Sequence, residues 1–353
     1  MNGLLVQRKR NLNVEALRIL AMLLIVLGHC IGHNHLVEYT RPSAWSYLIK
    51  FFQIITFPAT NIFVLITGYY QSQTTFKIRK VLLLWLQIFF YSSILYLVSI
   101  ISGRTALHPT ECLKALLPIS GNQYWFLRVF LGLYLLSPFL NELVKTLPQR
   151  KFQLLLLTNF ILFSLWRSFL PFATTLNSEG GNNIIWFVVL YLTGAYLAKF
   201  PIPFSARQIR WTLLGLTVFA YGTWLALNCV SCRLGLNGKG TSLFTEFTAF
   251  PIYGIAICAL LLAANCDSTI TNNRIGRIIA TCATSVLGVY MLHENIYVKR
   301  VLWPALDLPS IPAGLLLPAL LLTTCLIFIG CVFIDQLTWQ LVSRIVRNFT
   351  KSS

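Results

Sequence analysis

The chain has 353 residues, of which 56% are hydrophobic and 11% are charged, and its mean hydropathy is +0.70. Soluble domains carry about 25% charged residues, so this composition excludes an ordinary soluble protein. The formal net charge of +18 would suggest a nucleic-acid partner in a soluble protein, and its meaning here depends on where the charges lie.

Ten apolar windows are long enough to be membrane helices, because about 20 predominantly apolar residues cross a bilayer. They lie at residues 15–33, 45–68, 81–101, 124–141, 152–170, 184–199, 211–228, 247–264, 278–297 and 313–333. The first window follows a basic stretch, as in a signal peptide, but no small-residue cleavage site follows it and Arg18 interrupts it. We therefore predict an all-α, polytopic integral membrane protein of about ten transmembrane helices.

Lysine and arginine gather in alternate loops. With the N-terminus inside, 17 cations fall on cytoplasmic segments and 7 on the other side. This excess predicts that both termini are cytoplasmic, and it explains the net charge without nucleic acid. Lys299 and Arg300 are the exception, because they fall in an outer loop. The predicted organisation is a basic cytoplasmic segment (1–14), one membrane domain (15–335) and a basic cytoplasmic tail (336–353).

Nine cysteines are scattered along the chain, and only Cys229 and Cys232 form a CxxC pair, in a predicted outer loop. The loop lacks partner ligands for a metal. A disulfide and two free thiols remain equally open, since a disulfide depends on an oxidising compartment.

The first window carries two ionisable side chains, Arg18 and His29. Their separation of eleven residues is about three helical turns, or about 16 Å of rise, which places both on one helix face. Ionisable groups inside a bilayer usually face a protein interior or a wet cavity, so this stripe is expected to line a path. Taken singly, Arg18 could be an interfacial cation with a snorkelling side chain, and His29 a hydrogen-bonded core histidine.

A second polar cluster, His293 and Glu294, falls toward the outer end of the ninth window, near Tyr290. A buried glutamate beside a histidine could orient it or accept a proton. An interfacial polar cluster at a helix end is the alternative. His33 and His35 follow His29, but no second group of carboxylates accompanies them, so no zinc site or other metal is expected. Trp125 is interpreted as an interface anchor rather than a sugar platform.

The Arg18, ten residues, His29 pattern resembles the signature of the acyltransferase-3 family, whose members are integral-membrane O-acyltransferases. Four further stretches resemble family motifs in the expected order: NIFVLITGYY (61–70), KIRK (77–80), YWFLRVFLGLYLLSPFLN (124–141) and SVLGVYMLHENI (285–296). Thr67 stands where serine is usual. The resemblance extends from about residue 11 to about residue 335.

The resemblance implies transfer of an acyl group, commonly acetyl from acetyl-CoA, to a hydroxyl. His29 would be the catalytic base, since histidine accepts protons near neutral pH. An acyl-histidine relay is equally open. Arg18, Lys77 and Arg79 would bind the CoA phosphates, for which arginine is suited. Positive-inside topology alone would also place Lys77 and Arg79 at this face.

The predicted function is thus O-acylation of a cell-surface or extracellular polysaccharide sugar in the bacterial cytoplasmic membrane. His293 and Glu294 would support the acceptor side. Expected partners are acyl-CoA, the glycan, membrane lipids and either a separate extracytoplasmic transferase or polysaccharide assembly proteins, with no nucleic acid. The alternative is a transporter or flippase for a glycan or anionic small molecule, in which the charged stripe lines a permeation route.

Overall fold

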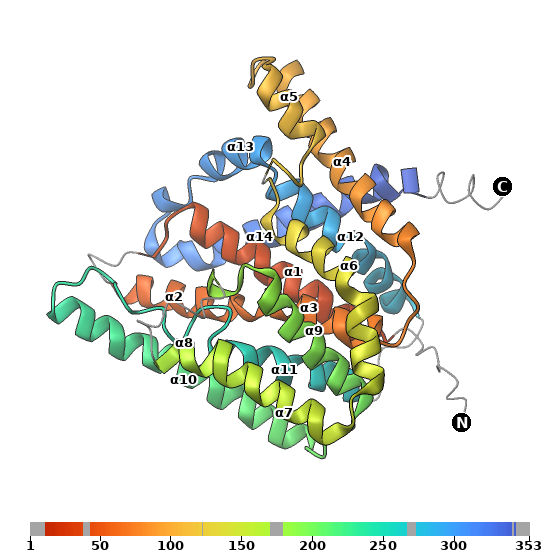
Figure 1. Cartoon of the computed structure of the whole chain (residues 1–353). Helices are drawn as coiled ribbons and strands as arrows, with labels where there is room; N and C mark the ends of the chain where they lie inside the picture. Colours follow the sequence, from red (N-terminus) through yellow and green to blue (C-terminus); the bar gives the residue numbers. More distant parts are fainter. Residues whose placement is uncertain are drawn as a thin grey trace, which may run out of the picture.

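The computed structural model describes residues 11–37, 43–121, 123–169, 179–266, 273–340 and 342–343. Within these ranges every regular element is helical (Figure 1), so the all-α prediction is confirmed for this part of the chain. The basic residues Arg8, Lys9 and Arg10 of the predicted N-terminal segment lie outside the described residues. The cations of the predicted tail, Arg344, Arg347 and Lys351, also lie outside them.

Helix α1, Leu12–His33, runs through the middle of the molecule (Figure 1). The side chain of Asn11 caps its start by accepting a hydrogen bond from the backbone N–H of Asn13. The helix packs against α2, α3, α12 and α14, and Ala21 and Val26 are fully buried. Most of α1 therefore faces protein rather than lipid, which is where ionisable side chains can be kept in a membrane.

Helices α2, Ala44–Thr56, and α3, Pro58–Gln71, form one membrane-length segment with a break at Phe57. Pro58 cannot continue the hydrogen-bond ladder of α2, because it has no backbone N–H, but its fixed φ angle suits the first turn of a new helix. The window 45–68 therefore matches this segment in extent, but it is two helices rather than one.

Helix α3 approaches α9, Ile184–Lys199, unusually closely. A Cβ atom on Gly68 would collide with the backbone carbonyl of Tyr191, and one on Gly194 would collide with the carbonyl of Leu65. Small residues allow such close backbone contact between membrane helices. Gly68, part of the NIFVLITGYY motif, is therefore required for packing.

The other helices surround this centre. The longer ones are α4 (Ile78–Ile101), α6 (Trp125–Thr146), α10 (Ala206–Arg233), α11 (Phe250–Asn265), α12 (Arg274–His293) and α14 (Ala313–Leu337). Helix α7 (Gln149–Phe160) continues through a π-helical stretch (Ile161–Leu165) into α8 (Trp166–Phe169). The shorter elements are α5 (Pro109–Leu116), α13 (Ile296–Leu306) and 3₁₀ turns at Glu179–Gly181 and Leu308–Ser310.

Seven helical segments of the described chain are long and apolar enough to cross a membrane, and α9 and α11 are shorter apolar helices. Each of the ten predicted windows coincides with helical structure. Only the seven segments above, however, are both long enough and apolar enough to count as candidate membrane spans in the described chain. Large apolar side chains on α14, including Leu322, Leu326 and Phe333, are exposed, as expected for a lipid-facing surface. The chain is a multi-pass membrane protein.

Two predicted boundaries are wrong. The ninth window ends at His293 rather than at residue 297, because the Asn295 side chain caps the start of α13. Lys299 therefore lies in the short helix α13, within the connection between α12 and α14. Helix α10 likewise extends to Arg233 and contains both cysteines of the CxxC pair, which are free thiols.

Candidate active site

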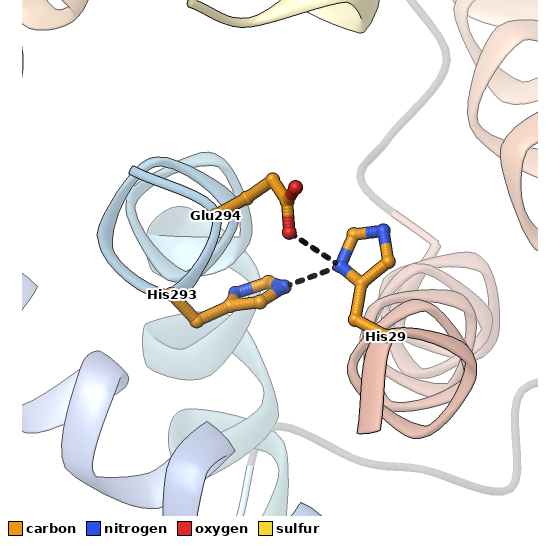
Figure 2. A group of neighbouring side chains, drawn as sticks. All are labelled: His29, His293 and Glu294. Carbon is orange, nitrogen blue, oxygen red and sulfur yellow. Dashed lines mark hydrogen bonds and ion pairs between the residues drawn. The ribbon is translucent and has the colours of Figure 1, made fainter. Parts of the chain in front are cut away.

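Three of the predicted site residues meet where α1 and α12 end (Figure 2). The Nδ1 atom of His29 lies 2.9 Å from Nε2 of His293 and 3.3 Å from a carboxylate oxygen of Glu294. His29 and His293 are 264 residues apart in sequence. The parallel packing of α1 and α12 brings them together, because each residue lies near the C-terminal end of its helix.

The hydrogen bonds determine which nitrogen of each ring carries a proton. Nδ1 of His293 lies 2.6 Å from the backbone oxygen of Val289, which can only accept, so His293 is protonated at Nδ1 when neutral. Its Nε2 must then accept a hydrogen bond from Nδ1 of His29. The lone pair of His29 is consequently left on Nε2, the ring nitrogen that points away from His293 and Glu294 in Figure 2.

Glu294 is held by two further residues. Its Oε1 accepts a hydrogen bond from Nζ of Lys299 at 2.9 Å, and its Oε2 lies 3.1 Å from Nε2 of His33. Glu294 is the residue after the last of α12. Burial alone would raise the pKa of this carboxyl, but the hydrogen bond from His33, the electrostatic effect of His29, and the hydrogen bond and charge of Lys299 outweigh burial and lower the pKa to about 2. The residue is therefore a carboxylate at neutral pH, fixed on both oxygens.

A cavity of about 250 Å³ lies beside the histidine cluster. His29 and Tyr290 belong to its wall, and α2, α3, α6 and two connecting segments complete it. The other lining residues are Met22, Ile25, Gly28, Gln53, Thr56, Phe57, Thr60, Phe63, Trp125, Phe126, Asn182, Phe247 and Leu287. The aromatic rings and uncharged polar groups suit a neutral, partly apolar molecule.

The cavity follows one face of α1. Arg18, Met22, Ile25 and His29 succeed one another at intervals of four, three and four residues, so they form one stripe. The last three line the cavity, whereas the partly exposed Arg18 lies one turn before Met22 and forms a 2.9 Å ion pair with Glu15. The stripe predicted from the sequence is thus partly a cavity wall.

Lys77 and Arg79 lie apart from the histidine cluster. Lys77 is the residue before α4 and Arg79 is in its first turn, just after the turn that leaves α3. Both residues are exposed. The structure therefore divides the six candidate residues into a histidine–glutamate cluster and a set of cations near helix starts.

The histidine–glutamate cluster also has the composition of a metal site. One ligand atom from each of His29, His293 and Glu294 lies within 4.8 Å of the other two. Two imidazoles and a carboxylate are a ligand set that several transition metals accept. Binding would require His29 to lose its Nδ1 proton, so a proton and a metal ion would compete for the same place.

Several site residues were not predicted from the sequence. His33 was considered only as a metal ligand, yet it contacts Glu294 and stacks on Trp303 at 5.1 Å. Its place four residues after His29, on the same helix face, was the available signal. Lys299, the exception to the charge pattern, is the partner of Glu294. Trp125 was interpreted as an interface anchor, but it lines the cavity and stacks with Phe247.

The family model described as an acyltransferase domain matches residues 11–335. The chain belongs to the acyltransferase-3 family. No curated protein and no solved structure matches it. The match confirms the resemblance found in the sequence motifs, and it includes the whole histidine cluster and the three cations. The chain is accordingly a membrane acyltransferase.

Proposed function

We propose that this acyltransferase moves an acyl group, most simply acetyl, from acyl-CoA to a hydroxyl of a cell-surface or extracellular polysaccharide sugar. The observation that carries the proposal is the arrangement of His29. One ring nitrogen is held by His293 and Glu294, and the ring belongs to the wall of a cavity. An oriented histidine with one free nitrogen is what a general base requires.

The proposed reaction begins when Nε2 of His29 takes the proton of the acceptor hydroxyl as its oxygen attacks the thioester carbonyl carbon. A C–O bond forms, and the carbonyl oxygen becomes an oxyanion. The C–S bond then breaks, and the CoA sulfur takes the proton from Nε2. The products are an O-acyl ester and free CoA. Glu294 and His293 act as positioning residues, since they hold Nδ1 and stabilise the charged ring.

Arg18, Lys77 and Arg79 are proposed to bind the phosphates of the acyl donor. The separation of about 16 Å between Arg18 and His29 along α1 is within the reach of an extended pantetheine arm. The cavity residues Met22 and Ile25 lie between them on the same face. In the proposed topology of about ten helices with cytoplasmic termini, the phosphates are bound at the cytoplasmic side and acylation occurs nearer the outer side.

The acceptor side of the proposal rests on the cavity lining. Trp125 and Phe247 are stacked at 6.3 Å, and the amide of Asn182 lies beside the same space. Aromatic faces with a few hydrogen-bonding groups suit a neutral sugar. The acyl group would pass to the glycan itself, or to a separate extracytoplasmic transferase or polysaccharide assembly protein that completes the transfer.

The test measures the O-acetyl content of surface polysaccharide by proton NMR, before and after mild alkali. Cells that lack the gene are complemented with wild type, His29→Ala or His108→Ala at matched membrane abundance. His108 is the matched control, because it is an exposed histidine that precedes α5. We expect wild type and His108→Ala to restore an alkali-labile acetyl signal, and His29→Ala to leave it absent.

Equal restoration by His29→Ala would remove this residue from the chemistry. A signal that never depends on the gene would contradict polysaccharide acetylation. Transport of a labelled glycan without CoA dependence would then favour the transporter or flippase. Labelled acetyl trapped on wild type but not on His29→Ala, and released by neutral hydroxylamine, would identify the acyl-histidine relay in place of general-base catalysis.

A further inference from the structure

Helix α2, which packs beside the histidine stripe, contains a side-chain pair with no place in the steps above. Lys50 on α2 donates a hydrogen bond from Nζ to Oε1 of Gln53 at 2.7 Å. Lys50 is buried, with 4% of its surface exposed, and its ammonium lies over the rings of Phe57 and Trp224 at 5.9 and 5.5 Å. Gln53 lines the cavity, whereas Lys50 does not.

This contact determines how the amide of Gln53 is oriented. An ammonium group can only donate, so the atom that it contacts must be the amide oxygen. The amide nitrogen then carries two N–H donors, and within the described part of the chain no residue accepts a hydrogen bond from them. Gln53 therefore offers donors at the wall of the cavity, and the positive charge behind it makes them stronger.

Gln53 and His29 approach the cavity from adjacent helices. A Cβ atom on Gly28 would lie 2.9 Å from Oγ1 of Thr56, so α1 and α2 are in close contact next to His29. The hydroxyl of Thr56 is itself used, because it donates to the backbone oxygen of Gln53 at 2.7 Å. The side chain of Gln53 lies one helical turn from this contact, on the same cavity.

We infer that Gln53 is a catalytic residue whose amide N–H groups bind the oxyanion formed from the acyl carbonyl, and that Lys50 is a positioning residue acting through it. The inference rests on the proposed function. Negative charge develops on this oxygen only as the C–O bond forms. A donor backed by a buried cation therefore stabilises the transition state more than the bound thioester.

The alternative role of Gln53 is recognition of an acceptor oxygen in the ground state. The two roles differ in which kinetic constant they change. Loss of a transition-state donor lowers kcat and leaves KM unchanged, whereas loss of a ground-state contact raises KM for the acceptor. The contact with a buried ammonium group favours the transition-state role, since a neutral sugar hydroxyl gains little from a cationic group behind its donor.

The experiment uses the full chain in lipid nanodiscs, with radiolabelled acetyl-CoA as donor and a panel of methyl glycosides as acceptors. Gln53→Glu keeps the shape of the side chain and its contact with Lys50, but it replaces the N–H donors with an acceptor oxygen. We expect kcat to fall roughly 10²- to 10³-fold with both KM values within about twofold of wild type. Gln153→Leu is the matched control, since Gln153 also hydrogen-bonds a side chain, Tyr196, but lies outside the cavity.

Lys50→Met provides a second test that does not depend on the first variant folding. It leaves the amide of Gln53 in place and removes the charge that orients it, so we expect a roughly tenfold lower kcat. Added to Gln53→Leu, Lys50→Met should cause no further loss, because it acts through the missing amide.

Three results would overturn the inference. A raised acceptor KM at unchanged kcat would assign Gln53 to acceptor binding, and wild-type kinetics in Gln53→Glu would remove it from the reaction. Full additivity of Lys50→Met with Gln53→Leu would separate the two residues. Failure of the proposed function would look different: neither wild type nor Gln153→Leu would transfer acetyl to any glycoside. In that case the inference about Gln53 would fall together with the proposed function.

Discussion

The two groups of ionisable residues in this molecule are built in different ways. At the end of α1, His29, His293 and Glu294 come from two helices, and Lys299 from a third fixes the carboxylate. At the start of α1, Arg18 forms an ion pair with Glu15 of its own helix, and Lys77 directly precedes α4. The residues proposed to hold the reacting proton are thus fixed by several helices, whereas the cations proposed to bind the donor phosphates lie nearer the surface.

The largest expected effect on turnover comes from removing His29, the central residue of the histidine–glutamate cluster. His29→Ala should lower kcat for acetyl transfer roughly 10²- to 10⁴-fold, because a positioned general base contributes this much. The measurement is turnover of radiolabelled acetyl-CoA by purified protein, with His108→Ala as the control. Binding of CoA should be unchanged, since Arg18, which we propose binds the CoA phosphates, lies three helical turns away from His29 on α1. A comparable loss of CoA affinity would show that the two groups are not separate.

Zinc should inhibit by taking the place of the proton on Nδ1 of His29, because three ligand atoms of the cluster lie within 4.8 Å. We expect the loss at saturating Zn²⁺ to approach that of His29→Ala, and a chelator to restore activity. The residual turnover of His293→Ala should be less sensitive to zinc. If a chelator alone inactivated the untreated enzyme, a resident metal rather than a free base would be responsible.

Glu294→Gln tests how much the contact between His29 and the Glu294 carboxylate contributes to turnover. The amide keeps the shape of the carboxylate but not its charge, so we expect His29 to be less well oriented and kcat to fall by up to roughly 10²-fold. The variant should also lose about 1–3 kcal/mol of stability, because the half-buried ammonium group of Lys299 loses its counter-charge. Thermal unfolding of Glu294→Gln with Lys299→Met should recover most of that stability without restoring kcat. Recovery of both would mean that the carboxylate only holds the fold.

Arg18→Ala should have the smallest effect. It removes one charged contact to a phosphate and should raise KM for acetyl-CoA roughly tenfold, with kcat within about twofold of wild type. Lys151→Ala, which changes an exposed cation at the start of α7, is the control. A fall in kcat at unchanged KM would place Arg18 in the chemical step and contradict its assignment to the donor phosphates.

Helical periodicity in the sequence predicted the stripe along α1 better than it predicted the cluster of His29, His293 and Glu294. The stripe from Arg18 to His29 lies within a single helix, so helical periodicity alone placed both residues on one face. The contact of His29 with His293 depends on packing across 264 residues, which no local pattern encodes. Family resemblance singled out both histidines, but it did not indicate that they touch.

The errors in the prediction have physical causes. The ninth window was extended past His293 because its apolar character continues into α13, and the cap formed by Asn295 was not considered. In the sequence, Lys299 is an exception to the positive-inside pattern, because it falls in a predicted outer loop. In the structure its charge is compensated by Glu294, so it is not a free cation at that surface. Gln53 was not singled out, because nothing in the sequence around it indicates a cavity.

The continuity of α1 between Arg18 and His29 has a consequence for how this segment can vary. Substitutions between the two residues alter the cavity lining or the packing of α1 but keep both residues on one face, whereas inserting or deleting one residue would rotate His29 about the helix axis by about 100° relative to Arg18. His29 would then point away from either His293 or the cavity. The length of this interval should therefore be the least variable property of the segment, even where its composition changes.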